Sequence, residues 1–196
     1  KLDFWKISSY LKGKTVLVTG SAGSIGSEIA RQVAEFGPSK LILLDAAETA
    51  LHDLQLEFQD KGINIPIEFV LANIRNEKRM RHIFESFSPE VVFHAAAYKH
   101  VPLVELNPAE AVLTNVMGTR LLADLSHEYR VSRFVFISTD KAVRPTNVMG
   151  ATKRFAEMYT QSLNDVAGIR TKFIATRFGN VLGSSGSVIP LFKKQI

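Results

Sequence analysis

The stretch Val16-Leu-Val-Thr19 followed by Gly20-Ser-Ala-Gly23-Ser-Ile-Gly26 decides the fold. Its first part is a short apolar run typical of a buried strand, and an apolar stripe beginning at Ile25 predicts a helix directly after the glycines. Glycine is needed at such a turn because the backbone bends sharply, approaches a bound phosphate and lets the helix pack closely on the strand. Free N–H groups at the start of the helix attract the negative charge.

This segment therefore predicts a site for the pyrophosphate of a dinucleotide. The residues that we expect to form it are Gly20, Gly23, Ser24, Ile25 and Gly26. The spacing is G-x-x-G-x-x-G, so the middle glycine departs from the usual G-x-G-x-x-G pattern. A glycine-rich surface turn is the alternative, and the strand before and the helix after disfavour it.

Strand and helix patterns alternate along the rest of the chain. Short runs rich in β-branched residues predict buried strands at 15–19, 40–44, 66–71, 91–93, 134–137 and 172–175. Strict alternation with helices implies βαβ units with right-handed crossovers. We therefore predict an α/β fold, a doubly wound parallel sheet of the Rossmann type.

The two ends of the chain fall outside this pattern. Residues 1–14 are expected to be an N-terminal arm or a linker from an upstream domain, and residues 15–196 to be the Rossmann domain. The sequence stops directly after a loop rich in glycine and serine. We interpret the chain as a fragment that lacks most of a C-terminal substrate-binding part.

Composition narrows the classes of function. The chain has no cysteine, and its five histidines are not at zinc-ligand spacing, so we expect no metal site. The net charge of +5 is compatible with an anionic substrate, a membrane surface or nucleic acid, but the clearest basic run, residues 75–81, alternates with Asn and Glu as a solvated helix face does. With no apolar run near the roughly 20 residues of a membrane span and no signal peptide, we expect a cytoplasmic chain that contacts neither membrane nor nucleic acid.

An acidic residue, Asp45, ends the second predicted strand. A carboxylate at this place accepts hydrogen bonds from the adenosine ribose hydroxyls and repels a 2′-phosphate, so NAD is favoured over NADP. The competing interpretation is a helix N-cap before Glu48. Further cofactor contacts are expected after the third and fourth strands, at Asn73, Ile74, Ala95 and Ala96.

Polar residues follow the fifth strand, in Ser138-Thr-Asp-Lys141. Ligands of open α/β sheets bind outside the carboxyl ends of the strands, so these side chains are expected at the nicotinamide end of the cofactor. Lys153 lies in a predicted helix at 147–164, where we expect Phe155, Tyr159 and Leu163 to pack inward.

Asn115 lies within a predicted helix at 109–125 and lowers its helix propensity. A hydrogen bond from its side chain to the loop after a neighbouring strand explains its presence better than solvent exposure does. We expect it to organise the site.

Five segments together resemble the extended short-chain dehydrogenase/reductases, and within them the large membrane-type nucleotide-sugar 4,6-dehydratases. The segments are 20–26, Ala95-Ala-Ala-Tyr-Lys-His-Val-Pro102, 138–141, Asn147-Val-Met-Gly-Ala-Thr-Lys153 and 177–190. The resemblance implies a redox-neutral elimination of water from a UDP-N-acetylhexosamine, in particular UDP-N-acetylglucosamine, with NAD as cofactor. The product would be a UDP-4-keto-6-deoxy sugar for polysaccharide biosynthesis.

The resemblance also implies roles for single residues. Asp140 would be the acid and Lys141 the base at C5, Thr139 would hydrogen-bond the C4 oxygen, and Lys153 would hold the nicotinamide ribose. An exposed loop ion pair is the alternative for Asp140 and Lys141. The positions that resemble contacts to the sugar diphosphate are Lys99, Asn180 and Ser187, for which a surface lysine and a flexible connector are the alternatives.

Met149 departs from the wider class, which has tyrosine four residues before the lysine as the proton acceptor. A thioether cannot accept that proton, so we expect Asp140 to take it, directly or through Thr139 or a water molecule. Members of the resembled family with methionine here belong to the branch that retains configuration at C5.

Two other functions are compatible with part of the pattern. A nucleotide-sugar 4-epimerase shares the fold and cofactor, but the absence of the tyrosine and the presence of Asp140 and Lys141 argue against it. A non-catalytic NAD-sensing module would keep the glycine loop, but the joint presence of Thr139, Asp140, Lys141 and Lys153 argues against that. The resemblance further suggests an upstream membrane domain in the parent protein, at the cytoplasmic face of the bacterial inner membrane, and a homo-oligomer.

Overall fold

A computed structural model describes residues 4–179 of the 196-residue chain. The strands are β1 (Thr15–Thr19), β2 (Lys40–Asp45), β3 (Ile67–Leu71), β4 (Val91–His94), β5 (Arg133–Thr139) and β6 (Lys172–Phe178). All neighbours pair in parallel, in the order β3-β2-β1-β4-β5-β6. The strand order reverses between β1 and β4, which is where open α/β sheets bind their ligands. The predicted Rossmann-type sheet is confirmed.

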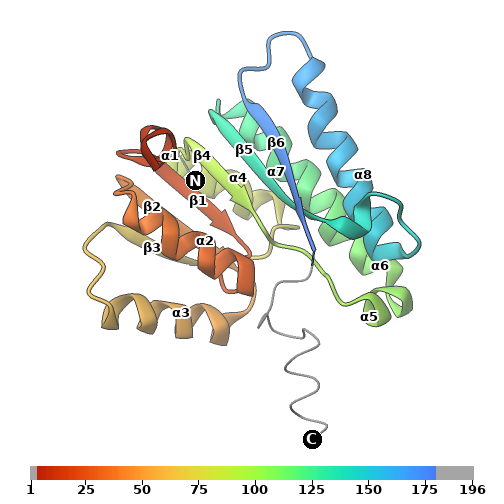
Figure 1. Cartoon of the computed structure of the whole chain (residues 1–196), viewed down its shortest axis with the longest axis horizontal. Helices are drawn as coiled ribbons and strands as arrows, with labels where there is room; N and C mark the ends of the chain where they lie inside the picture. Colours follow the sequence, from red (N-terminus) through yellow and green to blue (C-terminus); the bar gives the residue numbers. More distant parts are fainter. Residues whose placement is uncertain (1–3, 180–196) are drawn as a thin grey trace, which may run out of the picture.

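Helices connect the strands on both faces of the sheet (Figure 1). They are α1 (Phe4–Leu11), α2 (Ser24–Glu35), α3 (Glu48–Asp60), α4 (Glu77–Phe87), α5 (Val101–Leu106), α6 (Pro108–Ala111), the π-helical η1 (Val112–Gly118), α7 (Thr119–Glu128), α8 (Val148–Ser162) and the short 3-10 turns η2 (Asp140–Ala142) and η3 (Leu163–Asp165). In Figure 1 the first three strands, coloured red to yellow, form one half of the sheet, and the green and blue strands form the other. Within the described part of the chain, no helix is both long and apolar enough to cross a membrane.

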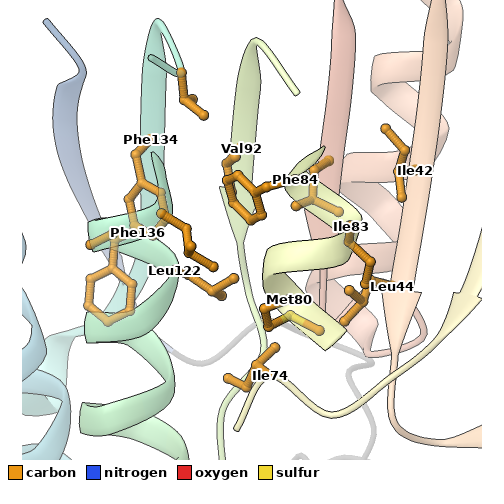
Figure 2. Close-up of a cluster of buried hydrophobic side chains, with 14 of the residues drawn as sticks. Ile42, Leu44, Ile74, Met80, Ile83, Phe84, Val92, Leu122, Phe134 and Phe136 are labelled. Carbon is orange, nitrogen blue, oxygen red and sulfur yellow. The ribbon is translucent and has the colours of Figure 1, made fainter. Parts of the chain in front are cut away.

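The side chains of each strand alternate between two apolar layers, as a sheet covered on both faces requires. Leu17, Ile42 and Phe134 point to the layer under α4, α7 and α8. Figure 2 shows Met80 and Phe84 of α4 in this layer, close to the strands. On the opposite face, residues of β1 and β2 pack against α1, α2 and α3. Leu11, the last residue of α1, is buried in that second layer.

The predicted inward face of α8 is partly wrong. Phe155 is 61% exposed, whereas Tyr159 and Leu163 pack at the edge of the core. The residues of α8 that face the interior include Met149, Lys153, Ala156 and Thr160. The apolar spacing is misleading here because part of the inner face of α8 is polar, with Lys153, Glu157 and Thr160 buried.

Candidate active site

The glycine loop is shaped by close backbone contacts. Gly20 has φ +69°, and a methyl group on it would lie 2.4 Å from the backbone nitrogen of Ala96. A methyl group on Gly26 would lie 2.0 Å from the carbonyl oxygen of Gly20. Gly23 is less constrained, since a methyl group there would be 3.3 Å from the same oxygen. Two of the three glycines are therefore required by the turn itself, before any ligand is considered.

The side chain of Asp45 is hydrogen-bonded to the backbone of the glycine loop. One carboxylate oxygen accepts a hydrogen bond from the backbone N–H of Ala22, and the other accepts from Ala47, both at 2.9 Å. The N-cap of α3 is Ala47 and not Asp45, so the competing interpretation as helix cap is wrong. Because each carboxylate oxygen has a further lone pair, Asp45 keeps the capacity to accept from ribose hydroxyls.

A cavity of about 320 Å³ collects the predicted cofactor residues at the switch point of the sheet. Its lining includes Gly20, Gly23, Ser24, Ile25, Gly26, Asp45, Asn73, Ile74, Ala95 and Ala96, together with Lys99. Every predicted cofactor residue except Lys153 thus lies around one cavity. Small side chains and a glycine turn at a helix N-terminus fit a dinucleotide well, since the pyrophosphate needs close backbone approach.

Thr114 and Tyr98 also line this cavity and were missed by sequence reasoning. Thr114 is buried, and its hydroxyl has no hydrogen-bond partner among the described residues. A buried, unsatisfied hydroxyl at a cavity wall is suited to bind a polar group of the ligand. Its position next to Asn115 is the only signal in the sequence, and that signal is weak.

Asn115 bonds to the loop after β4, as predicted, and in addition to α8. Its side chain accepts from the backbone N–H of Tyr98 at 2.8 Å and donates to the Tyr98 carbonyl at 3.0 Å. It also donates to the hydroxyl of Thr152 at 3.1 Å. The residue lies in the π-helical segment η1, and it fixes the backbone at Tyr98, which lines the cofactor cavity.

The predicted catalytic residues lie where β5 ends. The Thr139 hydroxyl donates to Asp140 Oδ1 at 2.9 Å, and Lys141 Nζ is 3.3 Å from the same oxygen. The hydrogen bond from Thr139, assisted by Lys141, lowers the pKa of Asp140. The pair is half-exposed, with 58% of the Asp140 side chain and 37% of the Lys141 side chain accessible. It does not line the cofactor cavity, but β5 pairs with β4, and Ala95 and Ala96 after β4 do line it, so the pair lies at the same carboxyl edge of the sheet.

Gly150 lets α8 approach this cluster. A methyl group at Gly150 would be 2.5 Å from the carbonyl oxygen of Lys141. The side chain of Asn147 caps α8 by accepting from the Gly150 N–H at 2.8 Å, and Glu105 accepts from Val148 N–H at 2.7 Å. The first turn of α8 is thus fixed against the residues that carry the proposed chemistry.

Lys153 is buried beneath the end of β5. Its ammonium group donates to the carbonyl of Ile137 at 2.6 Å and lies 4.1 Å from the ring centroid of Phe136. Burial lowers the pKa of Lys153 to about 7, although the charge of Glu157 opposes the shift. The Glu157 carboxylate is wholly buried and accepts two hydrogen bonds from the Arg177 guanidinium, at 2.9 and 2.6 Å.

Met149, the residue that replaces the usual tyrosine, is 4% exposed. It packs with Val104 and Ala111 in a small apolar cluster. The thioether therefore serves packing between α5, α6 and α8 and supplies no proton acceptor. Asn180 and Ser187 lie outside the described residues, so their predicted contacts to the sugar diphosphate remain predictions.

The fold and this site define an NAD-binding protein of the short-chain dehydrogenase/reductase class, related to enzymes that modify nucleotide sugars. The chain belongs to the family described as "Polysaccharide biosynthesis protein", whose model matches residues 16–196.

Three relatives show the range of named activities. The chain is 54% identical over its whole length to "Capsular polysaccharide biosynthesis protein CapD" of Staphylococcus aureus, of which it covers 33%. It is 36% identical, over 94% of its length, to "UDP-N-acetylglucosamine 4,6-dehydratase (inverting)" of Campylobacter jejuni, of which it covers 54%. A "UDP-glucose 4-epimerase" of Rickettsia canadensis is 34% identical over 93% of the chain, which covers 53% of it. The chain thus spans a third to about half of the length of these relatives.

Solved structures agree with the assignment of fold and cofactor. The "X-ray structure of Pen from Bacillus thuringiensis" superposes with a TM-score of 0.88 and 41% identity, over 95% of this chain and 58% of that one. The UDP-glucose 4-epimerase of Brucella ovis in complex with NAD gives a TM-score of 0.72 and 25% identity, over 88% of this chain and 54% of the other.

Proposed function

We propose that the protein to which this chain belongs is an NAD-dependent 4,6-dehydratase of a UDP-N-acetylhexosamine, with UDP-N-acetylglucosamine as the expected substrate. The product is a UDP-4-keto-6-deoxy sugar for the synthesis of a surface polysaccharide. The single observation that carries the proposal is the hydrogen-bonded group Thr139, Asp140 and Lys141 at the end of β5, on the edge of the sheet that carries the cofactor cavity, with methionine in the place of tyrosine. A named 4,6-dehydratase among the relatives supports it.

The proposed reaction begins with oxidation at C4. Bound NAD supplies a hydride acceptor for C4 and later a hydride donor for C6. The C4 hydroxyl must lose its proton, and Thr139 is suited to pass it on because its own hydroxyl already donates to Asp140. The lowered pKa of Asp140 supports this order of events, since the carboxylate starts ionised and able to accept.

Elimination then uses Asp140 again, together with Lys141. The C4 ketone acidifies the C5 proton, which Lys141 removes after its ammonium group, paired with Asp140 in the resting site, has passed a proton to solvent, from which it is regained at the end of the cycle. Asp140, now protonated, gives its proton to the departing C6 hydroxyl, which leaves as water. Lys141 would then give its proton back to C5, next to the carbon that NAD, when bound, would reduce. Each residue thus returns to its starting state, and the net change in the sugar is the loss of one water.

The nucleotide-sugar 4-epimerase is the second candidate, because a relative of 34% identity has that name. Epimerisation requires only oxidation and reduction at C4 and no acid–base pair at C5 and C6. Lys141, held 3.3 Å from Asp140, would have no role in it.

The test uses a protein that spans the length of these relatives, incubated with UDP-N-acetylglucosamine and NAD. We expect a product lighter by one water. A C4 epimer of unchanged mass would favour the epimerase, and tight NAD binding without turnover would favour a non-catalytic sensor.

A further inference from the structure

His94, the last residue of β4, is a buried histidine that joins three parts of the molecule. Its Nδ1 lies 2.6 Å from the hydroxyl of Thr19, the last residue of β1, and its Nε2 lies 2.8 Å from the hydroxyl of Thr119 at the start of α7. The ring is wholly buried and stacks on Phe136 at 5.6 Å between centroids. A buried polar ring with both nitrogens bonded is a fixed element of the structure.

The hydrogen bonds determine which ring nitrogen carries the proton. The Thr119 hydroxyl has one hydrogen and lies 2.7 Å from the carbonyl oxygen of Asn115, which can only accept. Towards His94 the Thr119 oxygen must therefore act as acceptor, so Nε2 bears the hydrogen. In the neutral ring Nδ1 is then an acceptor, and the Thr19 hydroxyl donates to it.

The surroundings of His94 keep the ring neutral. Burial, with a further contribution from the charge of Lys153 on α8, lowers the pKa of His94 to about 3. The side chains around it on β1, β5 and α7 include Thr19, Phe134, Phe136 and Thr119, which carry no charge. The tautomer defined by Thr119 therefore persists over the physiological range of pH.

Thr19 is the residue that leads into the cofactor loop. Thr19 and His94 are the last pair in the register of the β1–β4 ladder, and the Thr19 carbonyl accepts from Ala95 N–H at 2.9 Å. Directly beyond this pair, Gly20 turns away with φ +69° and passes against Ala96. The side-chain bond between Thr19 and His94 thus closes the ladder at the point where the glycine loop begins.

We propose that His94 is a positioning residue of the cofactor site: Thr119 sets its tautomer, and its Nδ1 then holds the Thr19 hydroxyl and with it the entrance to the glycine loop. The proposal concerns NAD binding and does not depend on which reaction the protein catalyses. Its failure and the failure of the proposed dehydratase function can therefore be distinguished.

Two substitutions of His94 separate positioning from packing. In His94→Asn the side-chain oxygen stands near the place of Nδ1 and can still accept from Thr19. In His94→Gln the amide stands near the place of Nε2, keeps the contact to Thr119 and leaves Thr19 without an acceptor. Both variants lose the stacked ring, so their losses of thermal stability should be similar.

The measurement is the affinity of the 196-residue chain for NAD, by calorimetry. We expect His94→Asn to bind within about threefold of the original chain and His94→Gln to bind about tenfold more weakly, the usual range for one buried donor left unsatisfied. Equal affinities of the two variants, or weaker binding by the Asn variant, would overturn the proposal in favour of a histidine that only packs.

A second pair of variants tests whether the hydrogen bond between Thr19 and His94 supports NAD binding, even if both His94 variants fail to fold. Thr19→Val removes the donor to His94, whereas Thr160→Val removes an equally buried hydroxyl whose bonds within the described part of the chain go to Ala156 and Glu157 of α8. We expect Thr19→Val to weaken NAD binding about tenfold and Thr160→Val to leave it unchanged. Equal NAD affinities in this pair would overturn the proposal. So would a nitrogen NMR spectrum of the unsubstituted chain with the proton on Nδ1 of His94.

Discussion

Thr139 donates a hydrogen bond from its hydroxyl to the Oδ1 of Asp140, 2.9 Å away. This bond is the largest cause of the lowered pKa of Asp140. A carboxylate stabilised in this way begins a reaction cycle as a proton acceptor and becomes an acid only after it has received a proton. The order of steps in the proposed mechanism therefore depends on this pair.

The first prediction concerns Asp140→Asn. The amide cannot accept the C4 proton, so we expect turnover of UDP-N-acetylglucosamine to fall by about 10²–10⁴-fold, with no transient NADH absorbance. Thr139→Val should lower turnover and NADH formation less than Asp140→Asn does, because Asp140 remains to accept the proton. An Asp140→Asn enzyme that forms NADH at the original rate would exclude Asp140 as acceptor and leave it only a role in elimination.

Lys141→Met is predicted to separate oxidation from elimination. The variant keeps Asp140 and Thr139, so NADH should still form, but solvent deuterium should not enter C5. Lys172→Met, which removes an exposed lysine of β6, is the matched control. With this variant, solvent deuterium should enter C5 as it does with the original enzyme. Deuterium uptake by the Lys141→Met enzyme, measured by mass spectrometry, would remove Lys141 as the base.

The parallel sheet and the location of the cofactor cavity follow from local sequence patterns. Each strand is a short apolar run bounded by turn residues, and the carboxyl ends of parallel strands meet at one edge, so Asp45, Asn73 and Ala95 had to lie near the glycine loop. Phe155 was misassigned because apolar periodicity assumes an apolar interior, and the inner face of α8 carries Lys153 and Glu157.

The contacts that could not be predicted connect residues far apart in sequence. The bonds of His94 to Thr19 and Thr119 join β1, β4 and α7, and each of the three residues taken alone is compatible with an ordinary core position. The cavity wall formed by Thr114 likewise depends on how the π-helical segment places that side chain. Such relations require the tertiary structure, since no periodicity or spacing encodes them.

Gly26→Ala is predicted to destroy the cofactor site by steric overlap. The added methyl group would lie 2.0 Å from the Gly20 carbonyl oxygen, so the loop must move. We expect a loss of about 3 kcal/mol in the free energy of unfolding and NAD binding weaker by at least about a hundredfold.

Gly62→Ala is the matched control for this substitution. Gly62 has φ +61° with no atom within 4 Å of the added methyl group, so the change should cost about 1 kcal/mol of stability. It should leave the affinity for NAD unaltered. If Gly26→Ala bound NAD as well as Gly62→Ala does, the loop would not be the pyrophosphate site.

Asp45→Asn is predicted to relax the choice between NAD and NADP. The amide oxygen can still accept from Ala22 N–H and so hold the loop, but the charge that repels a 2′-phosphate is gone. We expect the ratio of the two affinities, measured by calorimetry, to shift by about tenfold towards NADP, which corresponds to about 1.4 kcal/mol. Asp53→Asn removes an exposed carboxylate from α3 and should leave the ratio as it is. A ratio unaffected by Asp45→Asn would mean that another residue makes the distinction.

The last prediction is a loss of stability in mild acid that originates at His94. In the unfolded chain the imidazole takes up a proton near its ordinary pKa of 6.5, whereas burial keeps the folded pKa near 3. Between these values the unfolded state binds more protons, so stability present at neutral pH is lost as the pH falls, by up to about 1.4 kcal/mol per pH unit. The His94→Asn variant lacks this titration. It should be the less stable protein at pH 7, and its deficit in the free energy of unfolding, measured with urea, should shrink from pH 6.5 towards pH 4. A deficit that stays constant over this range would show that His94 titrates alike in both states, and that the buried ring is not held neutral by the fold.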